Sequence, residues 1–177
     1  MSLLDLAKEE LLKSNVDKKH PFKLLSLATH GPDFPQVRTV VKRHCDAQLN
    51  LLIYTDSRAN KVEEISLNPN VTVLFYHAKK QLQIRMNAIA KVVENDSDLF
   101  KEHLHKVKSS NSTRDYSSAL KPGSKIEGDI AYTNEINFSL LRIEPSKIDV
   151  LKLNKNGHSR YLFTKQNGLW TTEKLVP

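Results

Sequence analysis

Three segments of the chain place hydrophobic residues at helical spacing. In the first, acidic residues come early and a lysine comes late, which is typical of an amphipathic helix aligned with its own dipole. In the second, Asp56 or Ser57 is the expected N-cap, and Asn68-Pro69-Asn70 ends the pattern. The predicted helices cover residues 3–13, 57–67 and 98–107.

Most other segments have the length and composition of β-strands, rich in β-branched residues. The pairs Asn156-Gly157 and Asn167-Gly168 predict tight hairpin turns. Residues 109–125 are polar and predict a loop, with a turn of helix around residues 116–120. The expected strands are 22–29, 36–44, 49–55, 71–77, 81–93, 136–144, 147–153, 158–164 and 169–175.

About eight strands in consecutive hairpins leave many sheet edges, and a small closed or partly closed antiparallel barrel removes them. We therefore expect a mainly β fold with two or three inserted helices. A length of 177 residues predicts one domain, with residues 1–20 as helix and lead-in and residues 21–177 as the barrel.

Composition narrows the classes of function. Lys and Arg number 27 against 20 Asp and Glu, giving a net charge of +7, but the basic residues are spread over every segment, so nucleic acid is not expected as a partner. No apolar run approaches the roughly 20 residues of a membrane span, and charges interrupt the N-terminal segment where a secretory signal would be apolar. Cys45 is the only cysteine, and no carboxylate cluster accompanies His103 and His105, so we expect a cytoplasmic protein without a metal site.

The junction between the third strand and the second helix is a candidate anion site. Thr55 ends the strand and the helix begins near Ser57, so free backbone N–H groups coincide with the side chains of Arg58, Asn60 and Lys61. Ordinary capping with solvated basic residues explains this segment better when it is taken alone.

Arg38 strengthens the anion interpretation. It precedes a β-branched strand that we expect to pair, through a hairpin, with residues 49–55, and this pairing would place Arg38 beside Tyr54 and Thr55. Arg38 and Lys61 would then approach the same point from two segments, and an arginine can bind a phosphate through two N–H groups.

With these residues in place, the chain resembles the pyridoxamine 5′-phosphate oxidase-related family of FMN-binding split barrels. The resemblance depends on the order and spacing of several short motifs and extends from about residue 21 to residue 177. The motifs are Arg38-Thr39-Val40-Val41, residues 54–61, Asn68-Pro69-Asn70-Val71 leading to Phe75-Tyr76, residues 83–88, and a closing hairpin with Arg160-Tyr161-Leu162 and Trp170.

The resemblance implies a split β-barrel that forms a homodimer with FMN at the subunit interface. In it, Arg38 and Lys61 would hold the FMN phosphate, while Gln83 and Arg160, the latter from the partner chain, would complete the pocket. The full set of implied FMN-binding residues is Arg38, Thr39, Val40, Val41, Tyr54, Thr55, Ser57, Arg58, Asn60, Lys61, Gln83 and Arg160.

The chain also departs from the vitamin-converting members of the family. Asn60 stands where those members have an arginine, and their Ser-Arg-Pro-x-x-Ser stretch has no match between residues 100 and 121. Their Arg-x-His becomes Asn156-Gly157-His158, and their tryptophan falls near Val150 or Leu151. These departures imply that the flavin site is kept and the pyridoxine phosphate site is lost.

We therefore expect an FMN-dependent oxidoreductase acting on a small molecule, and no side chain is nominated as catalytic. Three alternatives stay open: a true pyridoxamine or pyridoxine 5′-phosphate oxidase, a non-catalytic flavin carrier or sensor, and a barrel that binds haem or a deazaflavin.

Overall fold

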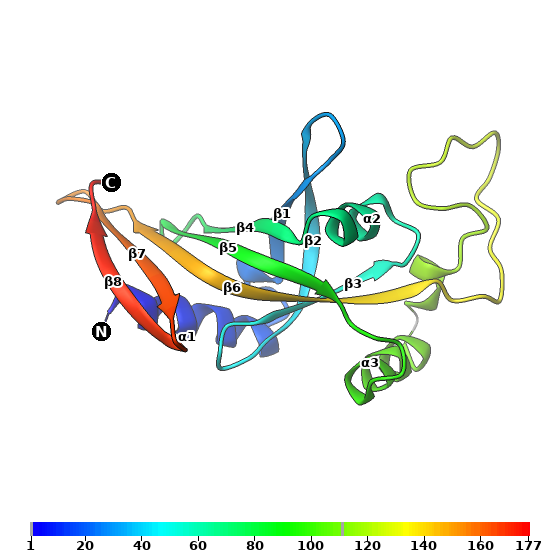
Figure 1. The fold of residues 1–177 in the computed structure, drawn as a ribbon, viewed down its shortest axis with the longest axis horizontal. Coiled ribbons are helices and arrows are strands. Elements are labelled where there is room, and N and C mark those ends of the chain that lie inside the picture. Colours follow the sequence, from blue (N-terminus) through cyan, green and yellow to red (C-terminus); the bar gives the residue numbers. More distant parts are fainter. Residues whose placement is uncertain (1, 111) are drawn as a thin grey trace.

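Eight strands and three α-helices make up the described part of the chain, residues 2–110 and 112–177 of a computed structural model (Figure 1). Two short 3₁₀ helices, η1 and η2, complete the secondary structure there. In chain order the elements are α1 (Leu3–Val16), η1 (Pro21–Lys23), β1 (Leu24–His30), β2 (Pro35–Cys45), β3 (Leu51–Asp56), α2 (Asn60–Leu67), β4 (Asn70–His77), β5 (Leu82–Val92), α3 (Asp98–Lys108), η2 (Thr113–Tyr116), β6 (Phe138–Lys152), β7 (Ser159–Gln166) and β8 (Leu169–Leu175).

The strands form one antiparallel sheet in the order β3-β2-β1-β4-β5-β6-β7-β8. Strand β3 also pairs with β6, which closes the first six strands into a barrel and leaves β7 and β8 outside it. In Figure 1 the β7–β8 hairpin lies at one end of the molecule, beside α1. The predicted antiparallel barrel with inserted helices is confirmed. In the described part, no helix is long and apolar enough to cross a membrane.

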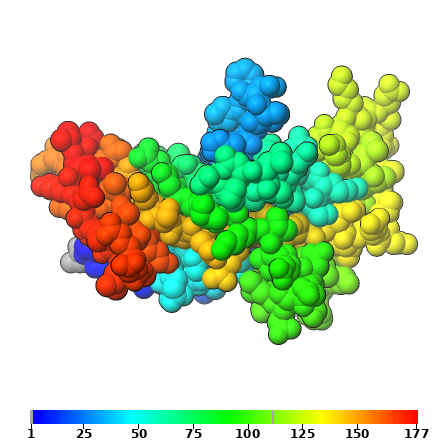
Figure 2. Space-filling model, viewed as in Figure 1, coloured from blue at the N-terminus to red at the C-terminus, as the bar shows by residue number. Residues whose placement is uncertain are grey.

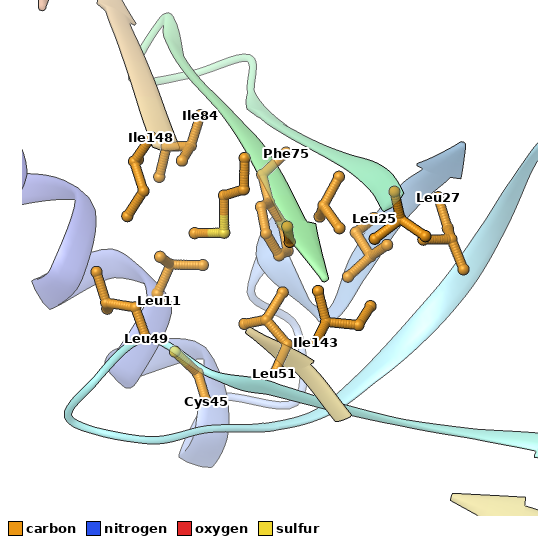
Figure 3. Close-up of a cluster of buried hydrophobic side chains, with 14 of the residues drawn as sticks. Leu11, Leu25, Leu27, Cys45, Leu49, Leu51, Phe75, Ile84, Ile143 and Ile148 are labelled. Carbon is orange, nitrogen blue, oxygen red and sulfur yellow. The ribbon is translucent and has the colours of Figure 1, made fainter. Parts of the chain in front are cut away.

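The core follows from the alternation along the strands. In β1 and β4 every second side chain is buried, as expected for strands with one face toward a barrel interior. Helix α1 adds Ala7 and Leu11 to this interior, and Figure 3 shows Leu11 close to Leu49 and Cys45 beneath the barrel strands. A second apolar cluster, which includes Phe100, packs α3 against the outer side of β3 and β6.

The helix boundaries test the capping predictions. Helix α1 has a capping box made by Ser2 and Asp5, in which each side chain accepts a hydrogen bond from the other residue's backbone N–H. The predicted N-cap of α2 is wrong, because the helix begins at Asn60 after Ala59, which makes no side-chain cap. Asp56 instead accepts a hydrogen bond from the backbone N–H of Arg58 at 2.8 Å, so its carboxylate stabilises a turn that precedes the helix.

Two further predictions differ from the structure. Residues 136–144 and 147–153 were expected as separate strands but form the single long strand β6, which runs through Pro145. Pro145 has no N–H to donate, and it lies opposite Ala88 where the β5–β6 register shifts, so the ladder accommodates it. The expected turn of helix around residues 116–120 lies slightly earlier, as η2.

Two projections stand out from the barrel. The β1–β2 hairpin and the segment between η2 and β6 both extend away from the body (Figure 1), and Figure 2 shows α2 between them. The tip of the hairpin carries Phe34 with 73% of its surface exposed.

A candidate anion and cofactor site

Arg38 enters the site from β2 at the end of the barrel. Its Nη2 donates a hydrogen bond to Glu64 Oε2 at 2.9 Å, and its Nη1 donates to Thr29 Oγ1. Thr29 in turn donates to the same Glu64 oxygen at 2.5 Å. The three side chains therefore form a closed triangle that joins β1, β2 and α2, with Thr29 and Glu64 buried and the Arg38 side chain 24% exposed.

Lys61 approaches from the first turn of α2. Its Nζ donates a hydrogen bond to Thr55 Oγ1 at 3.0 Å, at the end of β3. Burial and the nearby positive charge of Arg38 lower the pKa of Lys61, while Glu64 and Asp56 oppose that shift. Arg38 contacts Glu64, and Lys61 lies three residues before Glu64 on the same helix, so both cations adjoin this part of α2, and their binding of a phosphate stays a prediction.

The route to this convergence differs from the one expected. The ladder between β2 and β3 ends at the pair Lys42–Ile53, so Arg38 does not pair with the strand that contains Tyr54. Arg38 pairs instead with Leu27 of β1. It reaches the neighbourhood of Lys61 through Glu64, because α2 covers this end of the barrel.

This set of donors fits a phosphate group in its chemistry. A guanidinium and an ammonium provide two charge-assisted donors, and the hydroxyls of Thr29 and Thr55 lie beside them. Glu64 partly offsets the charge, since one carboxylate accompanies two cations and leaves the cluster with one net positive charge. Arg38, Lys61, Thr29, Thr55 and Glu64 are called the phosphate cluster below.

The side chain of Tyr54 points the other way, toward α3. Its hydroxyl lies 2.5 Å from His103 Nδ1, and the guanidinium of Arg43 lies 4.8 Å from the centre of its ring. Burial raises the pKa of Tyr54, and burial lowers the pKa of His103, so both groups are neutral near pH 7. The ring of Tyr54 therefore belongs to the α3 interface, and only its backbone adjoins the phosphate cluster.

The other predicted residues of the β3–α2 junction have separate roles in the structure. Ser57 and Asn60 are exposed, with Asn60 as the first residue of α2. Arg58 forms an ion pair with Asp56 and also donates to the carbonyl of Ser118, both through Nη2. Arg58 thus anchors the segment after η2, and its guanidinium is already occupied.

Alternation along β2 separates the predicted FMN-binding residues Thr39, Val40 and Val41. Val40 faces inward and packs against the core, whereas Thr39 and Val41 face outward. Register places further exposed apolar side chains on the same outer surface of β1, β2 and β4. These side chains, called the outer apolar face, are Leu24, Val37, Val41, Leu74 and Tyr76.

Gln83 and Arg160 lie in one row across the sheet, on either side of Leu151. The position that the resemblance gives for the family's tryptophan, near Val150 or Leu151, lies at or next to this row. The guanidinium of Arg160 is held by Asp149, with Nε–Oδ1 and Nη2–Oδ2 distances of 3.1 and 2.8 Å. Within one chain, Arg160 is thus bound to its own strand neighbour rather than to the phosphate cluster.

Asp149 was not predicted from sequence, because alternation places it on an outer face. It is 4% exposed, since Arg85 Nη2 also donates to its Oδ2 at 2.6 Å. Burial alone would raise the pKa of Asp149, but hydrogen bonds and charge from Arg160 and Arg85 outweigh it and lower the pKa. Glu64 was also missed, although its position three residues after Lys61 puts both on one helix face.

A buried cluster joins Glu10 of α1, His20 at the start of η1 and His77 at the end of β4. His20 Nε2 lies 3.2 Å and His77 Nε2 3.9 Å from Glu10 Oε2, and Lys80 also contacts the carboxylate. Both histidines accept a backbone N–H bond at Nδ1, from Phe22 and Lys80 respectively, so each neutral ring carries its proton on Nε2. A metal ligand would need that nitrogen free and a donor at Nδ1, so the cluster fits a hydrogen-bonded carboxylate better than an ion.

His158, singled out from the sequence, makes a local contact. Its Nδ1 accepts a hydrogen bond from the backbone N–H of Asn154 at 3.2 Å, within the β6–β7 connection.

Comparison with known proteins finds a matching family and curated relatives. Residues 6–94 match the family described as pyridoxamine 5′-phosphate oxidase, FMN-binding domain. A pyridoxine/pyridoxamine 5′-phosphate oxidase of Psychrobacter cryohalolentis is 35% identical over 92 residues, which is 51% of this chain and 41% of that protein. The chain thus matches about two-fifths of this curated relative's length.

Solved structures extend the similarity to the whole fold. A pyridoxamine 5′-phosphate oxidase-related, FMN-binding protein from Nostoc punctiforme superimposes with a TM-score of 0.77 at 21% identity, covering 100% of this chain and 99% of that one. PhzG from Burkholderia lata, in complex with tetrahydrophenazine-1-carboxylic acid, gives a TM-score of 0.76 at 18% identity, covering 98% and 92%.

Proposed function

Because the chain belongs to the pyridoxamine 5′-phosphate oxidase FMN-binding family, we propose that it is an FMN-dependent oxidoreductase that acts on a small molecule as a homodimer. FMN is the cofactor of this family. The observation that carries the proposal is the phosphate cluster, in which Arg38 of β2 and Lys61 of α2 each contact a threonine hydroxyl at the end of the barrel covered by α2.

Each group of residues has a distinct task in this proposal. When bound, FMN supplies the hydride or electron transfer, which is chemistry that no side chain provides. Arg38 and Lys61 would hold its phosphate, and the backbone of β2 around Val41 would support the flavin. Gln83, and Arg160 of the second subunit, would complete the pocket, as the resemblance implies.

The outer apolar face supports the homodimer. Leu24 pairs with Val41 across β1 and β2, and these two side chains are 54% and 40% exposed. Contiguous exposed apolar side chains on a sheet are a common mark of a protein–protein interface. A second copy seated there would cover the outer side of β2, the strand that bears Arg38, and the resemblance implies that this copy supplies Arg160.

A flavin titration tests the proposal directly. The apoprotein is titrated with FMN and followed by flavin fluorescence, for wild type, Arg38→Ala and a control, Arg142→Ala. Arg142 is a partly exposed arginine of β6 that pairs with Glu144. Losing a charge-assisted phosphate contact should weaken FMN binding by about 1.5–3 kcal/mol in Arg38→Ala only. Equal affinity in all three proteins would remove Arg38 from the site.

A true pyridoxamine 5′-phosphate oxidase is the second candidate, favoured by the 35% identity to the Psychrobacter cryohalolentis enzyme. Oxygen-dependent formation of pyridoxal phosphate by the FMN-loaded protein separates the two candidates. Turnover near 1 per second or faster would favour the vitamin reaction, since typical enzymes work at about that rate or above.

A further inference from the structure

A buried carboxylate ties helix α1 to three other parts of the chain. Glu10 is 1% exposed, and its Oε2 lies 3.2 Å from His20 Nε2 and 3.9 Å from His77 Nε2. Lys80 pairs with the other oxygen of the same carboxylate. The four side chains, called the Glu10 cluster below, come from α1, the residue before η1, the end of β4 and the β4–β5 turn. None of them belongs to the phosphate cluster.

The backbone fixes the protonation state of both histidine rings. The backbone N–H of Phe22 donates to His20 Nδ1 at 3.1 Å. The backbone N–H of Lys80 donates to His77 Nδ1 at 3.3 Å. Each neutral ring carries its proton on Nε2, so a second proton has to bind Nδ1, directly opposite a backbone N–H. That proton would break the cap of η1 at His20, or the hydrogen bond that stabilises the β4–β5 turn at His77.

Positive charge already exceeds negative charge around these rings. A hollow of about 500 Å³ beside the cluster is lined, in the described part of the chain, by four lysines and two carboxylates. A further proton on either ring therefore enters a positive environment, and Lys80 already pairs with the buried carboxylate that would attract it. From β6, Lys152 contacts the carbonyl of Lys80. The other charged and titratable groups that line the hollow are Glu10 and Lys13 of α1, Asp17, Lys19 and His20 of the segment before η1, and Tyr76, His77 and Lys79 of β4 and its turn.

The pKa shifts within the cluster agree with this geometry. Burial alone would raise the pKa of Glu10, but hydrogen bonds and charge from Lys80 and His20 outweigh it and lower the pKa. The carboxylate therefore stays ionised in mild acid. Burial lowers the pKa of His77 below its usual value of 6.5; the charge of Glu10 opposes this shift, and the charges of His20 and Lys80 add to it. A solvated His77 thus takes up its proton at a higher pH than the docked ring, and falling pH favours undocking.

Undocking of α1 would uncover the single cysteine of the chain. Cys45 is fully buried, and Asn15 of α1 accepts a hydrogen bond from its backbone N–H at 2.9 Å and donates one to its carbonyl at 2.8 Å. Leu11 of the same helix lies beside Cys45 (Figure 3). Burial raises the pKa of the Cys45 thiol to about 12, so the thiol is inert while α1 covers it. The reactivity of Cys45 therefore reports the position of α1.

We propose that the Glu10 cluster is a pH-sensitive latch, which holds α1 on the barrel at neutral pH and releases it when His20 and His77 take up protons in mild acid. Release opens the end of the barrel interior that Ala7 and Leu11 fill. The latch uses no residue of the phosphate cluster, so its test is independent of the proposed function.

Thiol reactivity tests the latch in the full-length protein. Cys45 is reacted with 4,4′-dithiodipyridine at about pH 7.5 and at about pH 5.5, on either side of the range in which histidine titrates. Each rate is divided by the rate for the urea-unfolded protein at the same pH, which removes the titration of the thiol and of the reagent. The variant combines His20→Asn with His77→Asn, because the asparagine oxygen can accept the backbone N–H in place of Nδ1 and does not titrate. The matched control is His158→Asn, since His158 is exposed and its Nδ1 also accepts a backbone N–H.

We expect the normalised rate of wild type to rise about tenfold or more from the higher to the lower pH, as expected when buried N–H groups lose their acceptors. His158→Asn should show the same rise, and the double variant should rise by less than about twofold because its latch has no histidine to protonate. Hydrogen exchange of wild type, followed by mass spectrometry at the lower pH, should show that peptides of α1 lose protection while peptides of β5 keep it.

An equal rise in wild type and in the double variant would overturn the inference, and so would a wild-type rate that does not change with pH. Equal loss of protection in α1 and β5 would mean that the whole domain unfolds, which would also overturn a latch confined to the helix. The exchange measurement uses wild type alone, so the test stays decisive if the double variant does not fold.

Discussion

Replacing Glu64 with glutamine should tighten FMN binding while it destabilises the apoprotein. The carboxylate of Glu64 lies 2.9 Å from Arg38 Nη2, within the cluster that would hold the phosphate. The substitution keeps a carbonyl oxygen that can accept from Arg38 and removes the negative charge. The charge of the cluster then rises by one unit, which favours a phosphate dianion.

The magnitude follows from Coulomb's law. Two anions that share one guanidinium lie about 6 Å apart, and a single charge opposite a dianion then costs about 1.4 kcal/mol even at the dielectric constant of bulk water, about 80. That cost equals about a tenfold change in Kd. A partly buried site has a lower effective dielectric constant, so about tenfold is the minimum expected for Glu64→Gln.

The stability effect has the opposite sign. Without a ligand, Glu64 is the buried carboxylate that faces Arg38. The pKa of Lys61 is lowered first by burial and then by the positive charge of Arg38. Neutralising Glu64 should therefore destabilise the apoprotein by about 1 kcal/mol, since a hydrogen bond to a charged group is weakened rather than removed. Urea unfolding of the apoprotein measures this change.

The assay compares FMN with riboflavin, which lacks the phosphate, in wild type, Glu64→Gln and Glu63→Gln. Glu63 is the exposed neighbour on the same helix and controls for the change in overall charge. Only Glu64→Gln should bind FMN more tightly, and its affinity for riboflavin should not change. Unchanged or weaker FMN binding in Glu64→Gln, or an equal gain for riboflavin, would refute the reasoning.

Four further outcomes are expected from the structure. Burial lowers the pKa of Lys42 to about 8 from 10.5, so between these two values the unfolded chain binds more protons and the free energy of unfolding should rise with pH. Lys42→Met should remove this part of the rise. The measurement is the difference in the free energy of unfolding between about pH 7 and about pH 10, which should be smaller in the variant. Asp149→Asn should cost about 2 kcal/mol in denaturant unfolding near neutral pH, because two guanidinium groups lose their counter-charge. Since the folded pKa of Asp149 is lowered, that cost should be full above pH 3.8 and should disappear as pH falls through the folded value. Tyr54→Phe should cost about 1–2 kcal/mol by leaving buried His103 Nδ1 without its partner, measured in the same way. Gly168→Ala should lower the free energy of unfolding by about 1 kcal/mol, because the β7–β8 turn holds this residue at φ +83° with open space around it, so a side chain adds strain and no clash.

Local patterns were sufficient for most of the fold. Segment length and β-branched composition predicted the strands, and Asn167-Gly168 predicted the last hairpin, where both residues adopt positive φ as a tight two-residue turn requires. The errors occur where a distant partner decides the outcome. Pro145 was taken as the end of a strand because the sequence does not show that β5 shifts register opposite it.

The residues of the candidate site also differ in whether local sequence or a distant partner determines their position. The sequence predicted that Arg38 and Lys61 approach each other through a pairing of β2 with β3 near Tyr54, but the structure does not have that pairing, and Arg38 contacts Glu64 of α2 instead. Thr29 could not be predicted, since its place in the cluster depends on the β1–β2 register, in which it is offset from Arg38 by two residues. The burial of Asp149 depends on Arg85 from β5 and Arg160 from β7, and no pattern within β6 alone contains that information.

Glu64 shows why stability and cofactor affinity should oppose each other at this site. A cluster that binds phosphate needs two adjacent cations, and adjacent cations destabilise a folded chain that has no ligand. A buried carboxylate offsets that repulsion before FMN arrives, and the same charge then competes with the phosphate for Arg38. Removing the negative charge of Glu64 should therefore raise FMN affinity and lower apoprotein stability together. Arg38→Ala should instead lower FMN affinity and relieve the repulsion on Lys61. Parallel changes of stability and affinity in Glu64→Gln would mean that the carboxylate serves only to orient Arg38.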